Sequence, residues 1–162
     1  MSTLKVTNLQ KLDGTTFPVG KIGQIVQGST TTATNIASTS FSDTGLSASI
    51  TPSSTSSKIL VTVNQNVVTN IDTNLGNSKI QLLRDGTTVI SWGENIARIE
   101  AGNQSAVKFG HLVTFAYLDS PASTSSIIYK TQGAVSSTSN NGQSQFQQSS
   151  VSSLITLMEV LA

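Results

Sequence analysis

The chain has 162 residues, a formal net charge of +1 at pH 7 and no cysteine. Only 10% of its residues are charged, against about 25% in an average domain. No basic patch could neutralise a nucleic-acid backbone, so the composition gives little support to nucleic-acid binding, and we expect none. The absence of cysteine excludes disulfides, thiolate metal sites and cysteine nucleophiles.

The length predicts one domain with a possible appendage. Serine and threonine are abundant, so hydroxyl groups rather than charges hydrate the surface. Such a surface suits a protein that packs densely beside copies of itself, and it equally suits a secreted or particle-surface domain. The N-terminus lacks the apolar core of a signal peptide, and no apolar run is long enough to span a membrane. We therefore expect synthesis in a cytoplasm and no membrane contact.

The first part of the chain predicts an extended arm. Residues 4–9 alternate like a strand, and Leu4, Val6 and Leu9 are its apolar side chains. Turn and breaker signals around Gly14 and Pro18 separate this segment from the rest of the chain. A segment this short cannot bury its own apolar side chains, so we expect these three residues to contact a neighbouring protein. The predicted division is an arm at 1–21 and a domain at 22–162, compact from about residue 45.

Residues 58–68 are the clearest strand. Ile59, Val61 and Val63 share one face, and the alternate positions are mostly polar, as in a strand with one buried face. A shorter strand at 46–50 precedes it and ends at Pro52. Residues 69–77 predict a loop because Asn and Asp tolerate turn geometry.

An Asp-Gly dipeptide at residues 85–86 predicts a tight hairpin between strands 79–84 and 87–92. Residues 93–102 come next as a loop or irregular edge strand, and residues 136–142 predict a second loop. The predicted strands in the rest of the chain are 107–118, 126–135, an edge strand at 143–148 and a closing strand at 153–161. The closing strand is nearly continuously apolar, which predicts burial on both faces.

Together these segments predict an all-β protein, an antiparallel β-sandwich of the jelly-roll kind with about eight to ten strands and an extended N-terminal arm. The predicted core comprises Ile59, Val61, Val63, Leu82, Val113, Phe115 and Leu157.

Few residues offer chemistry. His111 is the single histidine and lies among apolar positions of the long strand, which favours a buried or interfacial imidazole with a hydrogen-bond partner over a ligand or base. Glu94 and Glu100 supply two carboxylates, the raw material of glycoside hydrolysis, but from a segment of uncertain form. Trp92, Tyr117 and Tyr129 fit core positions better than sugar-stacking ones. We therefore expect no catalytic residue, no metal and no cofactor.

The order of strands resembles the trimeric jelly roll of the tumour-necrosis-factor type and of the globular head of complement. In that family a Leu-charged-Asp-Gly hairpin comes after the central strand, as Leu83-Arg84-Asp85-Gly86 does here, and an apolar strand ends the chain. The opening M-S-T-L-K-V-T-N-L-Q, the phrase I-T-P-S-S-T-S-S-K-I-L-V and the ending L-I-T-L-M-E-V-L are similar to small virion proteins of tailed bacteriophages, those of cyanobacteria in particular.

This resemblance implies a non-enzymatic virion structural protein, made in the host cytoplasm. The first expectation is a homotrimeric capsid cement or decoration protein whose arm contacts the major capsid protein or another virion protein. The alternative is a receptor-binding tip of a tail fibre, with loops 69–77 and 136–142 contacting host glycans. Fibre proteins usually carry a shaft before the head, and this chain has no shaft repeat.

Overall fold

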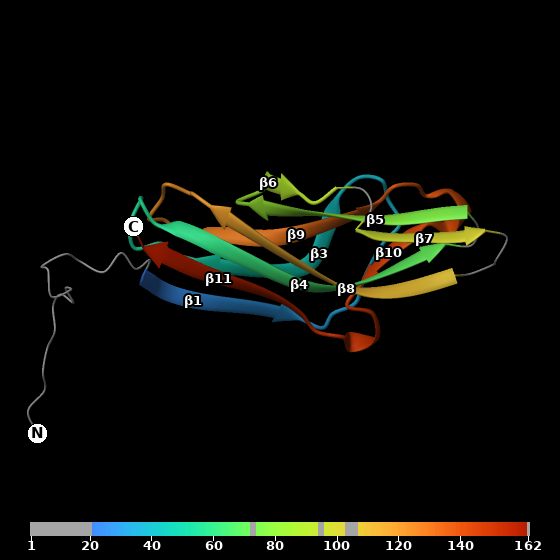
Figure 1. The fold of residues 1–162 in the computed structure, drawn as a ribbon, viewed down its shortest axis with the longest axis horizontal. Helices are drawn as coiled ribbons and strands as arrows, with labels where there is room; N and C mark the ends of the chain where they lie inside the picture. Colours follow the sequence, from blue (N-terminus) through green and yellow to red (C-terminus); the bar gives the residue numbers. More distant parts are fainter. Residues whose placement is uncertain (1–20, 72–73, 94–95, 103–106, 162) are drawn as a thin grey trace, which may run out of the picture.

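The computed structural model describes residues 21–71, 74–93, 96–102 and 107–161, which form antiparallel strands and two short 3₁₀ turns at Ser139–Asn141 and Gln148–Ser150 (Figure 1). The strands are β1 (Lys21–Thr30), β2 (Thr34–Ile36), β3 (Ser42–Ile50), β4 (Lys58–Ile71), β5 (Asn74–Arg84), β6 (Thr87–Ser91), β7 (Ala97–Gly102), β8 (Val107–Asp119), β9 (Ile127–Val135), β10 (Gln143–Phe146) and β11 (Ser153–Leu161).

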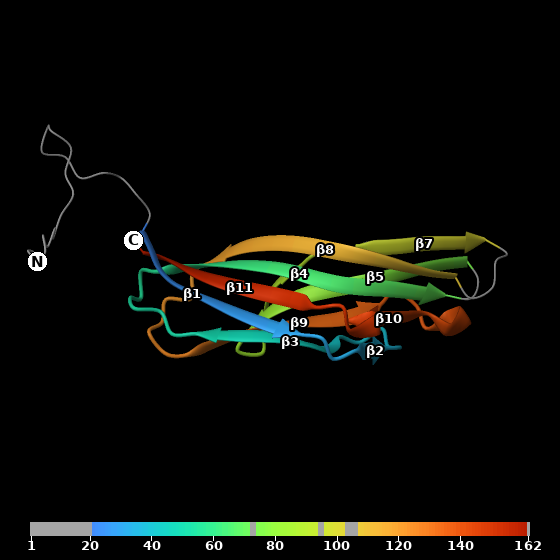
Figure 2. The same ribbon diagram turned by 90° about the horizontal axis from the view of Figure 1, so that it is seen from below.

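The strands form two sheets that stack as a sandwich (Figures 1 and 2). The first sheet has the order β1-β11-β4-β8, with β10 beside β4 beyond the end of β11 and β2 beside β10. The second sheet has the order β3-β9-β5, with β6 and β7 both along the far edge of β5. The chain crosses repeatedly from one sheet to the other, as in a jelly roll. The predicted all-β antiparallel sandwich is therefore confirmed.

Alternation along β4 builds the core. Ile59, Val61 and Val63 are at most 1% exposed, and the predicted core residues Leu82, Val113 and Leu157 are also buried. Phe115 is only partly buried, because it lies in β8 at the edge of the first sheet, where Trp92 stacks on it with ring centroids 4.2 Å apart. The predicted register of β4 is thus confirmed.

Polar side chains separate two hydrophobic clusters inside the sandwich. Gln65 lies between Val63 of one cluster and Val67 of the other along β4, and it is fully buried. Its Nε2 donates to Thr44 Oγ1 over 2.8 Å, and Thr44 Oγ1 lies 2.6 Å from Thr131 Oγ1. These bonds hold a layer of hydroxyl and amide groups at the centre of the core, in which Gln65 Oε1 is the buried atom left without a hydrogen-bond partner.

Two segments differ from the sequence prediction because sheet pairing outweighs local preference. The loop expected at 69–77 is strand on both sides of residues 72–73: β4 continues to Ile71 and β5 starts at Asn74. The sequence predicts an edge strand at 143–148, but β10 lies between β2 and β4, and Phe146 is fully buried. Its ring occupies the place of a side chain at Gly133, where a Cβ would lie 2.3 Å from the Phe146 ring.

The closing strand β11 is central, as expected, but it is buried on one face only. Ile155 and Leu157 face the core at 0% exposure, whereas Leu154, Met158 and Val160 on the other face are partly exposed. No layer of the described chain covers that outer face. Strand pairing also begins earlier than residue 45, because β1 pairs with β11 from Lys21 onward.

Candidate interaction surface

An apolar patch lies on the outer face of the first sheet. The register places Met158 of β11 opposite both Ile25 of β1 and Leu60 of β4, and Leu60 opposite Leu118 of β8. These four side chains form a row across the whole sheet, since directly paired residues lie on the same face. The full patch comprises Ile22, Ile25, Leu60, Leu118, Met158 and Val160. Ile22 is 57% exposed, Ile25 61% and Leu118 49%, so the patch faces solvent in the single chain.

The outer face of the second sheet is polar. Asp43 accepts hydrogen bonds from Lys130 Nζ over 2.8 Å and from Gln132 Nε2 over 2.7 Å, and these bonds lower the pKa of Asp43 despite partial burial. Gln81 Nε2 donates to Gln132 Oε1 over 2.9 Å and continues the network. The two faces of the sandwich therefore differ sharply in their chemistry.

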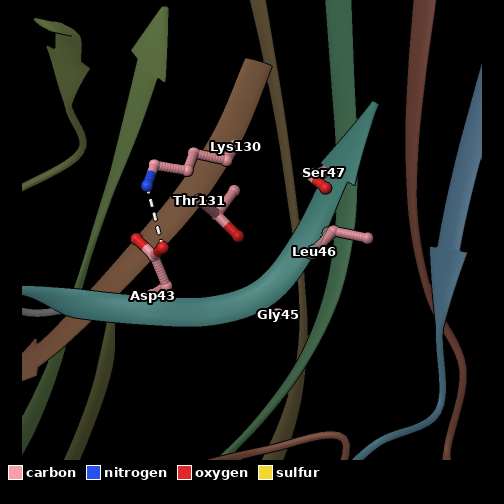
Figure 3. A pocket seen from close by; sticks show the side chains of 6 residues that line it. All are labelled: Asp43, Gly45, Leu46, Ser47, Lys130 and Thr131. Carbon is pink, nitrogen blue, oxygen red and sulfur yellow. Dashed lines mark hydrogen bonds and ion pairs between the residues drawn. The ribbon is translucent and has the colours of Figure 1, made fainter. Parts of the chain in front are cut away.

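A small hollow of about 80 Å³ adjoins this polar network (Figure 3). It forms where β3 loses register between Asp43 and Ser47, at Gly45 with φ +83°. Its lining residues are Asp43, Gly45, Leu46, Ser47, Lys130 and Thr131. The charged groups in it already bind each other, so the hollow presents no free charge to a ligand.

Glu159 is a buried carboxylate at the patch end of the sandwich. Its Oε1 accepts hydrogen bonds from Ser53 N over 2.6 Å and Ser53 Oγ over 2.7 Å, and its Oε2 accepts one from Gln24 Nε2 over 2.8 Å. Burial disfavours the charged form, but these hydrogen bonds outweigh it and lower the pKa to about 2. The carboxylate joins β1, β11 and the turn after β3, which is a structural role.

Asp119 joins the two sheets at the same end. Arg84 Nη1 donates to both of its carboxylate oxygens, over 2.9 and 2.7 Å, and Tyr129 Oη donates over 2.6 Å. Burial and the bond to Asp119 raise the pKa of Tyr129. Every polar group of this trio has a partner, so it stabilises the fold and offers no reactive group.

The other chemical candidates do not converge on a site. His111 is partly buried beside the Phe109 ring, and burial lowers its pKa, but its Nε2 lacks the expected hydrogen-bond partner. Glu100 pairs with Arg98, and Glu94 lies outside the described residues. Tyr129 is fully buried, while Trp92 and Tyr117 are partly buried against the core. Among the described residues, no three metal-ligating side chains gather.

The arm residues Leu4, Val6 and Leu9 lie outside the described residues, so their partner contact stays a prediction. The described part of the chain also contains no helix that is long and apolar enough to cross a membrane.

Comparison with known proteins identifies no family. No family model and no curated protein matches the chain. A chain of the infectious bursal disease virus T13 particle aligns with 95% of this chain at 13% identity and a TM-score of 0.48. A chain of the Gx strain of the same virus aligns with 98% of this chain at 12% identity and a TM-score of 0.39. The present chain covers 35% and 42% of those two chains, less than half of their length.

Sequence reasoning missed the patch, Glu159 and the role of Asp119. The apolar closing strand was the available signal for the patch, because its second apolar face requires a cover of some kind. For Glu159, the signal was one acid inside the run S-L-I-T-L-M-E-V-L, where an unpaired charge is costly to bury.

Proposed function

We propose that this chain is a non-enzymatic virion structural protein, a homotrimeric capsid cement or decoration protein anchored by its N-terminal arm. The observation that carries the proposal is the contrast between the two outer faces: one has six apolar side chains in register, and the other has a hydrogen-bonded polar network. A large apolar surface on one side marks a contact with another protein. Because the sequence resembles phage virion proteins, we infer that this contact is made within a virus particle.

The low charge of the chain supports association with its own copies. Only Lys58 and Lys108 are ionisable on the described outer face of the first sheet, and they lie near opposite ends of it. Like-charge repulsion between copies is therefore small. Light scattering of the purified protein is expected to give the mass of a trimer, and a clean monomer at micromolar concentration would contradict it.

The arm supplies the anchor in this proposal. Leu4, Val6 and Leu9 need a neighbour to bury them, and the segment joins the domain at Lys21, next to Ile22 of the patch. Three arms on one trimer would bind with avidity, because the second and third contacts form at high effective concentration. The partner is the major capsid protein or another virion protein.

Deletion of residues 1–10 tests the anchor. The truncated protein is expected to stay folded and to lose co-sedimentation with undecorated particles. The matched variants replace Leu4, Val6 and Leu9 by threonine, or Thr7 and Asn8 by alanine; only the first is expected to detach. Full occupancy by the truncated protein would overturn the anchor, and failure of the truncated protein to fold would assign the arm to the domain's own sheet.

Copy number separates this proposal from a tail-fibre tip. Cement predicts hundreds of copies in a particle and a fibre predicts a handful, so quantitative mass spectrometry of purified particles decides between them. The fibre alternative requires glycan-binding loops at 69–77 and 136–142, and most of the first segment belongs to β4 and β5. A handful of copies would overturn the cement proposal.

A further inference from the structure

The free edge of β8 is unusually regular. Each of its 13 residues, Val107–Asp119, pairs with β4 without a register shift. Within the described part of the chain, its other edge pairs with no strand. An unpaired edge presents backbone N–H and C=O groups to any extended chain that approaches it.

The other edges of the sandwich are interrupted. The strand β1 loses register between Ile22 and Ile25, and β3 loses it between Asp43 and Ser47. The strand β6 has five residues and a register shift of its own against β5, and β7 has six residues and a register shift too. Bulges and short edge strands block the addition of further strands. Only β8 lacks these protections among the described edges.

The side chains of β8 favour a partner strand. Leu112 is 67% exposed and Leu118 is 49% exposed on the outer face, and Phe109 is 54% exposed near the start of the strand. Lys108 is the one lysine or arginine of β8, and its one acid, Asp119, is buried in the bonds to Arg84 and Tyr129. No charge on the outer face therefore opposes an apolar strand between Leu112 and Leu118.

We propose that residues 4–9 of another copy of this chain add to the free edge of β8. This inference rests on the proposed homotrimer and names the contact that would close it. It assigns residues 4–9 to the contact between copies instead of to the capsid anchor, because one short segment cannot occupy both. An added strand satisfies its backbone through the edge and its side chains through neighbouring pockets. Leu4 and Val6, two residues apart, would then extend the apolar row that ends at Leu118.

The proposed homotrimer, rather than the length of the arm, favours β8 of a neighbouring copy over β8 of the arm's own domain. The arm enters β1 at Lys21, and β1 and β8 are opposite edges of the first sheet, with two strands between them. The segment from Leu9 to Lys21 spans up to about 40 Å when extended, more than the roughly 15 Å that three strand spacings place between β1 and β8, so it is long enough to reach either edge. A contact from the arm of one copy to β8 of the next is head-to-tail, and such contacts close a ring when the rotation permits.

Exposed lysines test the edge. Leu112→Lys places a charge on the outer face of β8. We expect it to raise the dissociation constant of the trimer by about tenfold or more, as measured by analytical ultracentrifugation. The matched control is Ile128→Lys, which changes a 48% exposed isoleucine of β9 on the opposite face and is expected to leave the trimer intact. Melting curves of both variants check that the domain stays folded.

Cysteine pairs test the arm, since the chain has no cysteine of its own. Asn8→Cys is combined with Thr114→Cys or with Ala116→Cys, both exposed on β8, or with Ser49→Cys on β3 as a control. Oxidation is expected to give a covalent trimer in a β8 pair only. A disulfide requires Cα atoms within about 7 Å, so a product confined to β8 fixes the register.

The outcomes separate this inference from the proposed function. The arm–β8 contact is overturned, and the homotrimer is not, if Leu112→Lys leaves the trimer intact and the β8 cysteine pairs give no covalent trimer. A wild-type monomer overturns both. Covalent trimer with normal particle binding by the truncated protein supports the contact and overturns the anchoring role of the arm.

Discussion

At the scale of residues, two buried carboxylates are stabilised by hydrogen bonds from the protein rather than by contact with water. Glu159 is 1% exposed, yet three hydrogen bonds from Ser53 and Gln24 keep it ionised. Asp119 is 5% exposed and accepts hydrogen bonds from the Arg84 guanidinium and the Tyr129 hydroxyl. Both carboxylates tie segments distant in sequence, so their loss affects the fold more than the loss of a surface charge.

Glu159 gives the domain an acid-sensitive element. Its pKa of about 2 lies below the ordinary value of 4.5, so its ionised form stabilises the fold above pH 4.5 and this contribution is lost as pH falls toward 2. Glu159→Gln is expected to lower the melting temperature at pH 7 and to flatten its fall between pH 4.5 and 2. Glu100→Gln, at an exposed site, is the control. An unchanged pH profile in Glu159→Gln would contradict this role.

Asp119 and Asp43 form a second matched pair. Asp119→Asn leaves the Arg84 guanidinium and the Tyr129 hydroxyl without their acceptor, and it is expected to cost about 2–4 kcal/mol of unfolding free energy. The Asp43 side chain is 55% exposed beside Lys130, so Asp43→Asn is expected to change it by less than about 0.5 kcal/mol. Urea unfolding measures the free energy of unfolding of both variants. A loss in Asp119→Asn as small as the one expected for Asp43→Asn would show that the ion pair between the sheets is dispensable.

At the scale of elements, close approach of backbones sets which glycines matter. A Cβ on Gly28 of β1 would lie 2.1 Å from the carbonyl oxygen of Ser47 in β3, whereas a Cβ on Gly110 of β8 would meet only Val68 at 3.7 Å. The two strands β1 and β3 thus close one side of the sandwich through a glycine contact.

Gly28→Ala is expected to destabilise the domain by about 1–3 kcal/mol, because β1 must move away from β3. Gly110→Ala is expected to be neutral or slightly stabilising, since alanine loses less conformational entropy than glycine in a strand. Thermal unfolding of the two variants gives the comparison. Equal stability would mean that β1 shifts at no cost.

Local pattern predicted the strands, and long-range pairing decided the rest. The alternation of β4 and the Asp-Gly turn at Asp85 and Gly86, both with positive φ, are local features and were predicted correctly. The position of β10 beside β4 and the one-sided burial of β11 depend on which strands meet. The patch depends on register across four strands, which no single segment of sequence encodes.

At the scale of the whole molecule, association and stability are linked. A folded trimer in equilibrium with unfolded monomers has a melting temperature that rises with protein concentration. We expect this rise for the full chain. Its absence, together with a trimer mass at every concentration, would show that the trimer survives unfolding of its domains and would contradict coupled assembly. The Leu112→Lys variant is measured at the same concentrations, and we expect its melting temperature to depend less on protein concentration.

The central place of β11 has a consequence for biosynthesis. It is made after every other strand of the sandwich, yet it lies between β1 and β4. At about 5–20 residues per second, β1 waits on the order of ten seconds on the ribosome for its neighbour. During that interval the edges of β1 and β4 that later pair with β11 have no partner strand on the growing chain. The nascent polypeptide, rather than the finished domain, is therefore the species that most needs a chaperone.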